Sequence, residues 1–425
     1  MSSLRISKAA ALQGEIRVPG DKSITHRALL FAAAAESPSV IHDPLWGNDC
    51  ISTARCLQQL GIEIVREPDG PVKVSPSEWQ QPESALDCGN SGTTMRLLSG
   101  MIASRDLRAT LTGDASLQKR PMKRIAEPLR RMGAGFEGDF PPITIQGSGQ
   151  LEGITYSMPV ASAQVKSCAL LAGARASGRT TVIEPAPSRD HTERLLRALG
   201  VSVHLNDNRV SIEGGASWNG FELTVPGDIS SAAFWMVAGL LVPESRLRLT
   251  NVGLNPTRSG ILDVLAQVGA QITVEPRGVS MGEPVGDVFV ESLEMGMPFT
   301  ISGNLVPRLI DEIPVLCVLA SQLDGRSEIR DAAELRVKES DRIELVARNL
   351  REMGVHVETF EDGLAVHGPT KLKGAQVEAH LDHRIAMAFA VAGLIADGET
   401  EILESQTIDT SYPGFLDDLN RVRVI

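Results

Sequence analysis

The chain has 425 residues, 42% of them hydrophobic and 22% charged, and its formal net charge is −12 at pH 7. That length exceeds one ordinary core and suits two domains, and the composition is typical of a soluble globular protein. The acidic balance argues against sequence-independent binding to nucleic acid or a membrane surface, but local Lys and Arg clusters can still hold small anions.

A polar or charged cluster runs directly into an apolar helix six times along the chain. The gaps between successive clusters are 68, 71, 68, 81 and 71 residues, measured between the markers Ser23, Ser91, Ser162, Ser230, Asp311 and Asp382. Each cluster predicts a helix start, where backbone N–H groups and the helix dipole favour anions. We therefore predict six repeated units whose helix starts face a common anion-binding site.

A second phrase, a short helical ending followed by glycine and an apolar residue, recurs between these starts. Its glycines are Gly61, Gly133, Gly200, Gly269 and Gly354. Each predicts the last turn of an amphipathic helix, a left-handed glycine cap and then a strand. Asn420 stands at the equivalent position of a sixth copy. Each unit of about 70 residues thus holds a buried helix, an outer helix and several short strands.

Six such units fit two closed globules of three units each. We place the crossings between the globules near residues 17–20 and 224–227, with the active site in the cleft between the two globules. Both crossings end in Pro-Gly, at Pro19 and Pro226, and lead into a polar helix start. Loop positions of this kind suit a hinge for domain closure.

The cysteines and the apolar runs predict a cytoplasmic protein. The five cysteines form no CxxC pair, which is typical of reduced thiols. Residues 1–13 contain no apolar signal core, and the apolar runs at 232–242 and 385–396 are too short for a membrane span.

Basic residues gather at the first helix starts. Lys22, Ser23 and Arg27 lie on one face of the first helix and could hold phosphate or carboxylate, although a capped surface helix with two cations explains them equally well. Small residues around Gly92 let the backbone approach a ligand. Arg120 precedes a proline that restrains it to extended geometry, where a guanidinium can bind phosphate through two hydrogen bonds.

Acidic residues with neighbouring cations follow in the second half. Lys338 and Arg342 are expected on one helical face with Glu339 beside them, unless this is an ordinary exposed helix with ion pairs. Asp311, between apolar runs, is either a helix N-cap or a base with a raised pKa. His380 and His383 lack a third ligand, so we expect no metal. Together the clusters favour group transfer between phosphorylated or carboxylated small molecules.

At these residues the chain resembles the family of 3-phosphoshikimate 1-carboxyvinyltransferases, also called 5-enolpyruvylshikimate-3-phosphate synthases. The resemblance spans nearly the whole chain and rests on residues 20–27, 89–96, 119–122, 162–167, 188–193, 336–342 and 382–384. It implies a two-lobed inverse α/β barrel of six βαβαββ units, three per lobe in pseudo-threefold symmetry. It also implies that the first strand joins the C-terminal lobe, so that one lobe contains residues 1–19 and 228–425 and the other contains residues 20–227.

The resemblance implies transfer of the enolpyruvyl group of phosphoenolpyruvate to the 5-hydroxyl of shikimate 3-phosphate, with release of phosphate and no cofactor. It gives the catalytic roles to Asp311, Glu339, Lys22 and Lys338. Shikimate 3-phosphate would be bound by Lys22, Ser23, Arg27, Ser162, Ala163, Gln164, Arg189, Asp311 and Lys338. Phosphoenolpyruvate would be bound by Lys22, Asn90, Gly92, Arg120, Gln164, Arg342 and Arg384. We expect a monomer with these two small-molecule partners.

Two positions depart from the family's patterns. One branch carries a Lys before Thr-Phe-Pro near its C-terminus, whereas this chain has residues 409–413 without a Lys, so that phosphoenolpyruvate contact is not carried over. The sequences of the motifs at residues 119–122 and 188–193 resemble the other branch of the family. Glyphosate-insensitive members of that branch have Ala at the position of Gly92. Gly92 thus favours sensitivity to glyphosate and the resemblance to this branch favours insensitivity, so both responses stay open, with sensitivity preferred.

Two rival functions differ in specific residues. The sister enolpyruvyl transferase that acts on a UDP-amino sugar has Lys-Asn in place of Lys22 and Ser23 and uses a loop cysteine as acid, whereas residues 118–124 contain no cysteine. A non-catalytic, two-lobed anion-binding protein would lack the carboxylates of Asp311 and Glu339.

Overall fold

The computed structural model describes residues 2–68 and 70–424. The chain forms two compact units. Unit 1 contains Met1–Pro19, Gly227–Gly278 and Pro284–Ile425, and unit 2 contains Gly20–Pro226 and Val279–Glu283.

Unit 2 is built from short strands and six α-helices among the described residues. The helices are α1 (Lys22–Ala33), α2 (Asn48–Gln59), α3 (Gly92–Ala103), α4 (Lys123–Arg131), α5 (Ala163–Gly173) and α6 (His191–Ala198), with a 3-10 turn η1 (Leu117–Lys119). The strands are β3 (Ser39–His42), β4 (Glu63–Arg66), β5 (Val72–Ser75), β6 (Leu86–Asp87), β7 (Arg108–Thr112), β8 (Gly135–Glu137), β9 (Ile143–Gln146), β10 (Thr155–Ser157), β11 (Arg179–Ile183), β12 (Val203–Asn206), β13 (Arg209–Glu213) and β14 (Glu222–Thr224). They form three four-stranded sheets in the orders β14-β3-β5-β4, β6-β7-β9-β8 and β10-β11-β13-β12.

Unit 1 repeats this plan. Its helices are α7 (Ile229–Leu241), α8 (Gly260–Val268), α9 (Val306–Leu309), α10 (Ile313–Ala320), α11 (Arg342–Glu352), α12 (His383–Gly393) and α13 (Phe415–Val422), with 3-10 turns η2 (Gly303–Leu305), η3 (Ala333–Val337) and η4 (Ser405–Thr410). Its strands are β1 (Ser3–Ile6), β2 (Ala11–Arg17), β15 (Arg246–Gly253), β16 (Ile272–Ser280), β17 (Glu283–Glu291), β18 (Thr300–Ile301), β19 (Gly325–Ile329), β20 (His356–Phe360), β21 (Gly363–Gly368), β22 (Gln376–Glu378), β23 (Thr400–Leu403) and β24 (Arg423–Val424). Within the described chain they form sheets in the orders β16-β17-β15-β2-β24, β18-β19-β21-β20 and β1-β23-β22.

The element order confirms the repeated unit. The series β6-α3-β7-α4-β8-β9 and β10-α5-β11-α6-β12-β13 are both βαβαββ, and each pairs its first two strands in parallel and the rest antiparallel. Two strands are exchanged between units. β2 precedes α1 in the chain but pairs with β15 of unit 1, whereas β14 precedes α7 but pairs with β3 of unit 2. The expected placement of the first strands with the C-terminal half is therefore confirmed.

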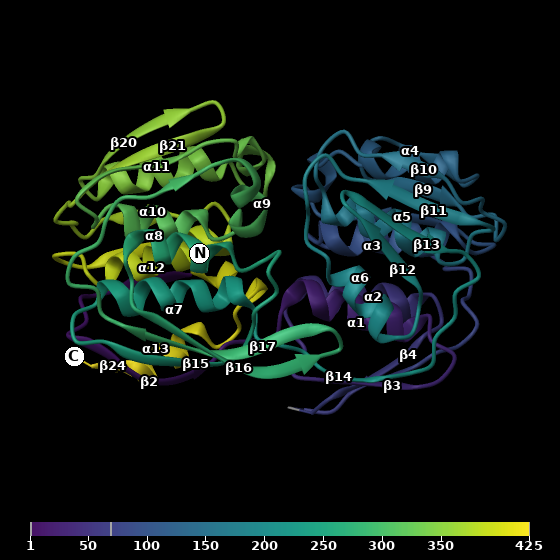
Figure 1. Ribbon diagram of the computed structural model, residues 1–425, viewed down its shortest axis with the longest axis horizontal. Helices are drawn as coiled ribbons and strands as arrows, with labels where there is room; N and C mark the ends of the chain where they lie inside the picture. The colour runs from purple at the N-terminus through teal and green to yellow at the C-terminus, as the bar shows by residue number, and fades with distance from the viewer. Residues whose placement is uncertain (1, 69, 425) are drawn as a thin grey trace. The chain divides into compact units, whose positions relative to one another are not determined.

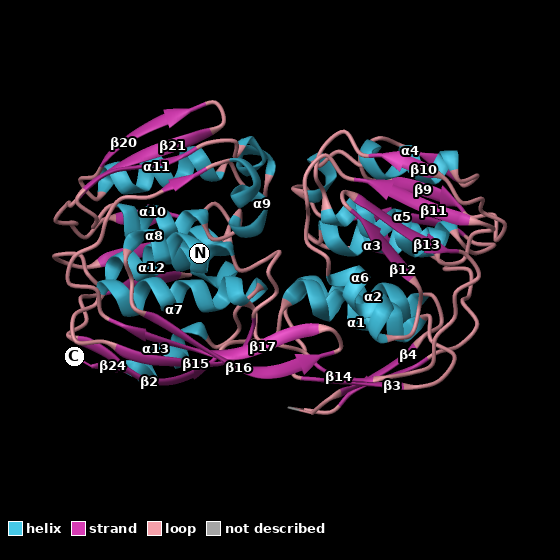
Figure 2. Cartoon of the chain, viewed as in Figure 1, coloured by secondary structure: helices cyan, strands magenta, loops and turns pink. Residues whose placement is uncertain are grey.

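The six predicted helix starts are confirmed. The helices begin at Lys22, Gly92, Ala163, Ile229, Ile313 and His383. At five of them the preceding residue caps the helix by accepting a backbone N–H, namely Asp21, Ser91, Ser162, Asp228 and Asp382. These helices are buried over most of their length and pack side by side within each unit, α3 against α5 and α10 against α12 (Figure 1). Strands lie on the outer side of each unit (magenta in Figure 2).

The predicted glycine caps are also confirmed, with one exception. Gly61, Gly133, Gly200, Gly269 and Gly354 have φ of 91°, 105°, 83°, 83° and 95°, in the left-handed region that favours glycine. The predicted cap at Asn420 is wrong. α13 continues through this residue to Val422, and the chain then enters β24, which pairs with β2.

Each unit has a hydrophobic core of its own. Buried residues of α7, α10 and α12 form the centre of one, and those of α1, α3 and α5 the centre of the other. All five cysteines are buried and none forms a disulfide, and Cys56, Cys88, Cys168 and Cys317 belong to these cores. No helix in the described part of the chain is long and apolar enough to cross a membrane.

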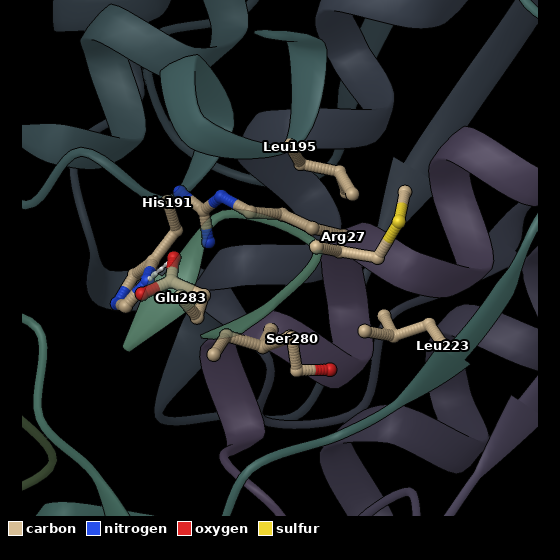
Figure 3. A pocket seen from close by; sticks show the side chains of 8 residues that line it. Arg27, His191, Leu195, Leu223, Ser280 and Glu283 are labelled. Carbon is tan, nitrogen blue, oxygen red and sulfur yellow. Dashed lines mark hydrogen bonds and ion pairs between the residues drawn. The ribbon is translucent and has the colours of Figure 1, made fainter. Parts of the chain in front are cut away.

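The turn between β16 and β17 is the part of the chain that departs from our expected division. We placed it with residues 228–425, but Val279–Glu283 pack with unit 2. The reason is polar anchoring: Glu283 Oε1 lies 2.7 Å from His191 Nδ1, and Arg194 Nη1 donates to the Gly282 carbonyl at 2.9 Å (Figure 3). The expected boundary after Gly227 lies one residue earlier, after Pro226.

Candidate active site

The start of α1 presents the first group of predicted residues. Lys22 Nζ lies 3.1 Å from Asp49 Oδ2, and both side chains stay partly accessible. Arg27 is buried one turn further on, donating from Nε to Thr192 Oγ1 and from Nη2 to Ser167 Oγ, both at 2.8 Å. Its Nη1 donates to the Ser23 carbonyl at 3.0 Å. Lys22 therefore faces a ligand more freely than Arg27, whose donors brace three parts of unit 2.

The start of α3 brings a second cation to the group. Arg120 Nη2 donates to Asn90 Oδ1 at 2.6 Å, and Asn90 Nδ2 donates to Asp114 Oδ2 at 2.7 Å. These bonds fix the guanidinium beside the first turn of α3. A Cβ added at Gly92 would lie 2.8 Å from Arg96 Nη1 and 3.6 Å from Arg120 Nη1. Glycine is therefore what lets the two guanidinium groups approach this helix start.

The start of α5 completes the set in unit 2. Gln164 accepts a hydrogen bond from Arg96 Nη1 and donates to Thr93 Oγ1 at 2.8 Å, which joins α5 to α3. Ser162 caps the helix and Ala163 is its first residue. The structure thus brings Lys22, Asn90, Gly92, Arg120, Ser162, Ala163 and Gln164 to the starts of three packed helices.

Positive charge concentrates where these helices meet. Burial lowers the pKa of Arg27 to about 10, and the charge of Arg189 acts in the same direction, whereas Glu193, Asp21 and Glu283 oppose it. Burial also holds the pKa of His26 well below its usual value, with Lys22 and Arg27 adding to the effect. An anion bound at these helix starts would relieve the repulsion between neighbouring cations.

Unit 1 contains a separate cluster centred on Arg342. Its side chain is 1% exposed, yet it contacts three carboxylates: Nε lies 2.8 Å from Asp382 Oδ2, Nη1 lies 3.2 Å from Asp311 Oδ1, and Nη2 lies 2.7 Å from Glu339 Oε2. Burial alone would lower the pKa of this guanidinium, but Asp382, Glu339 and Asp311 raise it above its ordinary value. Arg342 therefore stays charged and fixes three acidic groups around itself.

Asp311 has two further cationic neighbours. Lys338 Nζ lies 3.6 Å from Asp311 Oδ1, and Arg384 Nε lies 3.8 Å from the same oxygen. Arg384 Nη1 also donates to the Asp311 carbonyl at 3.5 Å. The carboxylates of Asp311 and Glu339 thus contact the two terminal nitrogens, Nη1 and Nη2, of the Arg342 guanidinium. Such a pair can accept a proton at one position and donate one at another.

Two expectations about this cluster are wrong. Lys338 and Arg342 do not share a helical face, because Lys338 is extended after η3 and α11 begins only at Arg342. Asp311 is not an N-cap, since Glu312 occupies that position of α10 without a side-chain cap bond. The alternative of an exposed helix with ion pairs is also wrong for Arg342, which is buried.

Sequence reasoning missed the carboxylates that orient the predicted cations. Asp49, which pairs with Lys22, carries no recognisable signal in the sequence. Asp382 marked only a helix start, yet it holds Arg342 from 40 residues away. Tyr412, in the C-terminal stretch without the family's Lys, is a core residue whose hydroxyl accepts from Trp235 Nε1 at 2.9 Å.

Among the cavities of unit 2, one is too small for a substrate and another lies away from the helix starts. One, of about 10 Å³, has room for about one water molecule and is lined by Arg27, His191 and Glu283 among others (Figure 3). The other, of about 440 Å³, is lined by Ala33, Ser104 and Arg105 at the C-terminal ends of α1 and α3. A helix of 12 residues spans about 18 Å, so this cavity lies far from the helix starts.

His380 and His383 do not form a metal site in the described chain. His380 Nε2 lies 2.9 Å from Glu378 Oε2 and 3.0 Å from Arg348 Nη2, which is a surface ion-pair arrangement. Among the residues that the structure describes, no three His, Cys, Asp or Glu side chains come together as a metal would require.

Comparison with known proteins gives one consistent result. The family model of EPSP synthases (3-phosphoshikimate 1-carboxyvinyltransferases) matches residues 6–419. A 3-phosphoshikimate 1-carboxyvinyltransferase of Gloeobacter violaceus is 52% identical, with 98% of each chain covered, and one of Bacillus cytotoxicus is 47% identical, with 99% of each covered. The solved EPSP synthase of Acinetobacter baumannii has a TM-score of 0.90 at 42% identity, covering 100% of this chain and 99% of that one. The enolpyruvyl transferase NikO of Streptomyces tendae, at 20% identity and a TM-score of 0.81, shares the fold.

Proposed function

We propose that this chain, which belongs to the EPSP synthase (3-phosphoshikimate 1-carboxyvinyltransferase) family, divides its reaction between a substrate-binding unit 2 and a proton-transferring unit 1. The enzyme transfers the enolpyruvyl group of phosphoenolpyruvate to the 5-hydroxyl of shikimate 3-phosphate in the shikimate pathway of aromatic amino acid biosynthesis. Phosphate is the other product.

The chemistry requires two proton movements at separate atoms. The 5-hydroxyl oxygen attacks C2 of phosphoenolpyruvate and loses its proton, while the methylene carbon C3 gains one. The resulting tetrahedral adduct then loses a proton from C3 as the C–O bond to phosphate breaks, which regenerates the double bond. Two positioned acid–base groups are therefore needed, one at the hydroxyl and one at the methylene carbon.

The shared contact of Asp311 and Glu339 with Arg342 is the observation that carries the assignment of these groups. Asp311 receives the hydroxyl proton, and Glu339 gives a proton to the methylene carbon and takes it back. Lys338, 3.6 Å from Asp311 Oδ1, keeps that carboxylate charged and able to accept a proton. Arg342 and Arg384 hold phosphoenolpyruvate and stabilise its developing charge.

Unit 2 supplies most of the binding groups in this proposal, and Arg342 and Arg384 of unit 1 add to them. Shikimate 3-phosphate is bound at the starts of α1 and α5 by Lys22, Ser23, Arg27, Ser162, Ala163 and Gln164, and before α6 by Arg189, while Asp311 and Lys338 of unit 1 contact its reacting hydroxyl. Phosphoenolpyruvate is bound at the start of α3 by Asn90, Gly92 and Arg120, with Lys22 and Gln164 between the two substrates. The convergence of cations on helix starts supports this assignment, because both substrates are anionic.

Substitution of the binding residues tests the division. Arg120→Ala should raise the KM for phosphoenolpyruvate, and Arg189→Ala the KM for shikimate 3-phosphate, each by roughly tenfold or more. Lys123→Ala, which removes an exposed cation three residues from Arg120, should change neither KM. Equal changes in both KM values for both variants would overturn the assignment.

The assay is phosphate release with each substrate varied in turn. Release that needs shikimate 3-phosphate and does not occur with a UDP-amino sugar agrees with the function, and release with the UDP-amino sugar contradicts it. We further propose that the enzyme works in the cytoplasm as a monomer. A dimer in sedimentation at assay concentration would overturn the second point.

A further inference from the structure

Lys166 is a buried lysine that the reaction does not use directly. It lies in α5 and is 1% exposed, in the same motif as Ser162 and Gln164. Its Nζ lies 2.8 Å from Glu184 Oε2 and 2.7 Å from Glu193 Oε1, and both carboxylates are buried as well. Glu193 belongs to the second motif, residues 188–193. The ion pair between Lys166 and Glu193 therefore connects the motif at residues 162–167 with the motif at residues 188–193.

The two carboxyl groups favour the charged form of Lys166. Burial alone would lower the pKa of Lys166, but Glu193 and Glu184 raise it. Burial raises the pKa of Glu193, and Lys166 opposes that change. Because desolvation offsets most of the attraction in buried ion pairs, such a cluster is weak evidence for stabilisation. The role of the cluster is indicated instead by the backbone that it holds in place.

The cluster holds the backbone next to Arg189. Lys166 Nζ donates to the Ser188 carbonyl at 3.3 Å, and Ser188 Oγ donates to Glu184 Oε1. The carbonyl and the hydroxyl of Ser188, the residue before Arg189, are thus fixed from α5 and from the residue that follows β11.

The other side of the same segment is also anchored. Thr192 Oγ1 accepts from Arg27 Nε at 2.8 Å and lies 2.7 Å from Ser167 Oγ. His191 pairs with Glu283 of the β16–β17 turn (Figure 3). Residues 188–193 are therefore restrained at both ends, and Arg189 is the cation between them. Its charge acts on buried Arg27, so the two guanidinium groups are electrostatic neighbours.

We propose that Lys166 is a positioning residue, which fixes residues 188–193 so that the Arg189 guanidinium meets shikimate 3-phosphate in its binding geometry. The proposal rests on the assignment of Arg189 to that substrate. Lys166 itself contacts no substrate, and its effect passes through Ser188 and Glu193. A misplacement of about 1 Å in a binding group can cost up to about 100-fold.

The experiment compares Lys166→Met with the natural enzyme. The variant should raise both the KM and the Kd for shikimate 3-phosphate roughly 10- to 100-fold, while kcat at saturation and the KM for phosphoenolpyruvate change less than about threefold. Trp218→Phe is the matched control, because it removes a buried hydrogen bond, from Nε1 to the Phe31 carbonyl at 2.9 Å, at the far end of α1. It should lower the melting temperature and leave every KM unchanged.

A double-mutant cycle separates positioning from general loosening. In an Arg189→Ala background, Lys166→Met should add less than about threefold to the Kd for shikimate 3-phosphate, because the positioned group is already absent. Full additivity would overturn the proposal. So would an unchanged Kd in Lys166→Met when Arg189→Ala alone weakens binding. If Arg189→Ala leaves the Kd unchanged, the assignment of Arg189 fails first.

A milder variant covers the case in which Lys166→Met does not fold. Glu184→Gln keeps the shape of the site and leaves the Lys166–Glu193 pair, but weakens the hold on Ser188. It should raise the Kd for shikimate 3-phosphate at least about threefold, again only when Arg189 is present. A Kd equal to that of the natural enzyme would overturn the proposal.

Discussion

Asp311→Asn is the substitution that probes the proposed proton transfer most directly. Asn keeps the size of the side chain and an acceptor for Arg342 Nη1 and Lys338 Nζ, which lie 3.2 and 3.6 Å from Asp311 Oδ1. What it removes is the ability to take a proton. In the cluster, the charges of Arg342, Lys338 and Arg384 balance those of three carboxylates, so the substitution leaves one uncompensated positive charge. That charge favours the anionic substrates, so binding should not weaken.

The expected loss of kcat in Asp311→Asn follows from the proposed role of Asp311 as the base. Positioned acid–base groups contribute about 10²- to 10⁴-fold to rates, which corresponds to about 3–5 kcal/mol at 1.36 kcal/mol per tenfold. Asp311→Asn should therefore lower kcat by that factor and change the KM for shikimate 3-phosphate by less than about threefold.

The assay is steady-state phosphate release with both substrates varied. Asp341→Asn serves as a matched control in the same segment, because Asn caps a helix as well as Asp does and this carboxylate pairs with Arg336 at 2.8 Å. Its kcat should stay within about twofold of the natural enzyme, since its charge is partly exposed. A loss of less than tenfold in Asp311→Asn would refute the base role.

Three further predictions concern binding, pH and stability. Gly92→Ala would place a Cβ 2.8 Å from Arg96 Nη1. The KM for phosphoenolpyruvate should therefore rise roughly tenfold, and competition by glyphosate should weaken. An unchanged KM and an unchanged inhibition constant for glyphosate would contradict this prediction. Because the pKa of buried His26 lies well below 6.5 in the folded state, its contribution to stability is present above pH 6.5 and is lost as pH falls. The loss should be about 1.4 kcal/mol per pH unit in urea unfolding, and His26→Leu should flatten it; equal slopes would refute the assignment. Arg342→Met should cost about 3–5 kcal/mol of unfolding free energy, because it strands buried carboxylates, whereas Arg348→Met at the surface should cost under about 1 kcal/mol.

The repeated helix starts and glycine caps were predictable because their causes are local. A capping side chain such as Ser91 or Asp382 acts on the helix that follows it, within three residues. Gly133 and Gly269 end helices because their own φ is positive, so the sequence reports them directly. The predicted cap at Asn420 was wrong because α13 continues to Val422, where the chain enters β24. This strand pairs with β2, which lies more than 400 residues away in the sequence.

The arrangement around Arg342 could not be predicted, because its partners are remote in the sequence. Asp311 and Asp382 lie 31 and 40 residues away. The expected helix through Lys338 failed for a similar reason. Arg336 donates to the carbonyls of Glu361 and Phe360 at 2.7 and 2.6 Å, and these bonds hold the segment before α11 in an irregular path. Tertiary bonds override helix propensity here.

The contacts of the carboxylates in unit 2 could not be predicted from the sequence either, because their partners are also remote in the chain. Lys166 and Glu193 stood in recognisable motifs, but only the fold brings them to Ser188. The turn at Glu283 joins unit 2 through a bond to His191, 92 residues away. Motifs therefore predicted the candidate site residues, and the tertiary structure supplied the contacts that each one makes.

Calorimetric titration of shikimate 3-phosphate, without phosphoenolpyruvate, tests the division of roles most directly. The titration compares Asp311→Asn in unit 1 with Arg189→Ala in unit 2. If unit 2 binds this substrate and unit 1 moves protons, Asp311→Asn should keep the Kd within about threefold, and Arg189→Ala should raise it at least tenfold. Loss of binding in Asp311→Asn together with unchanged binding in Arg189→Ala would contradict the account.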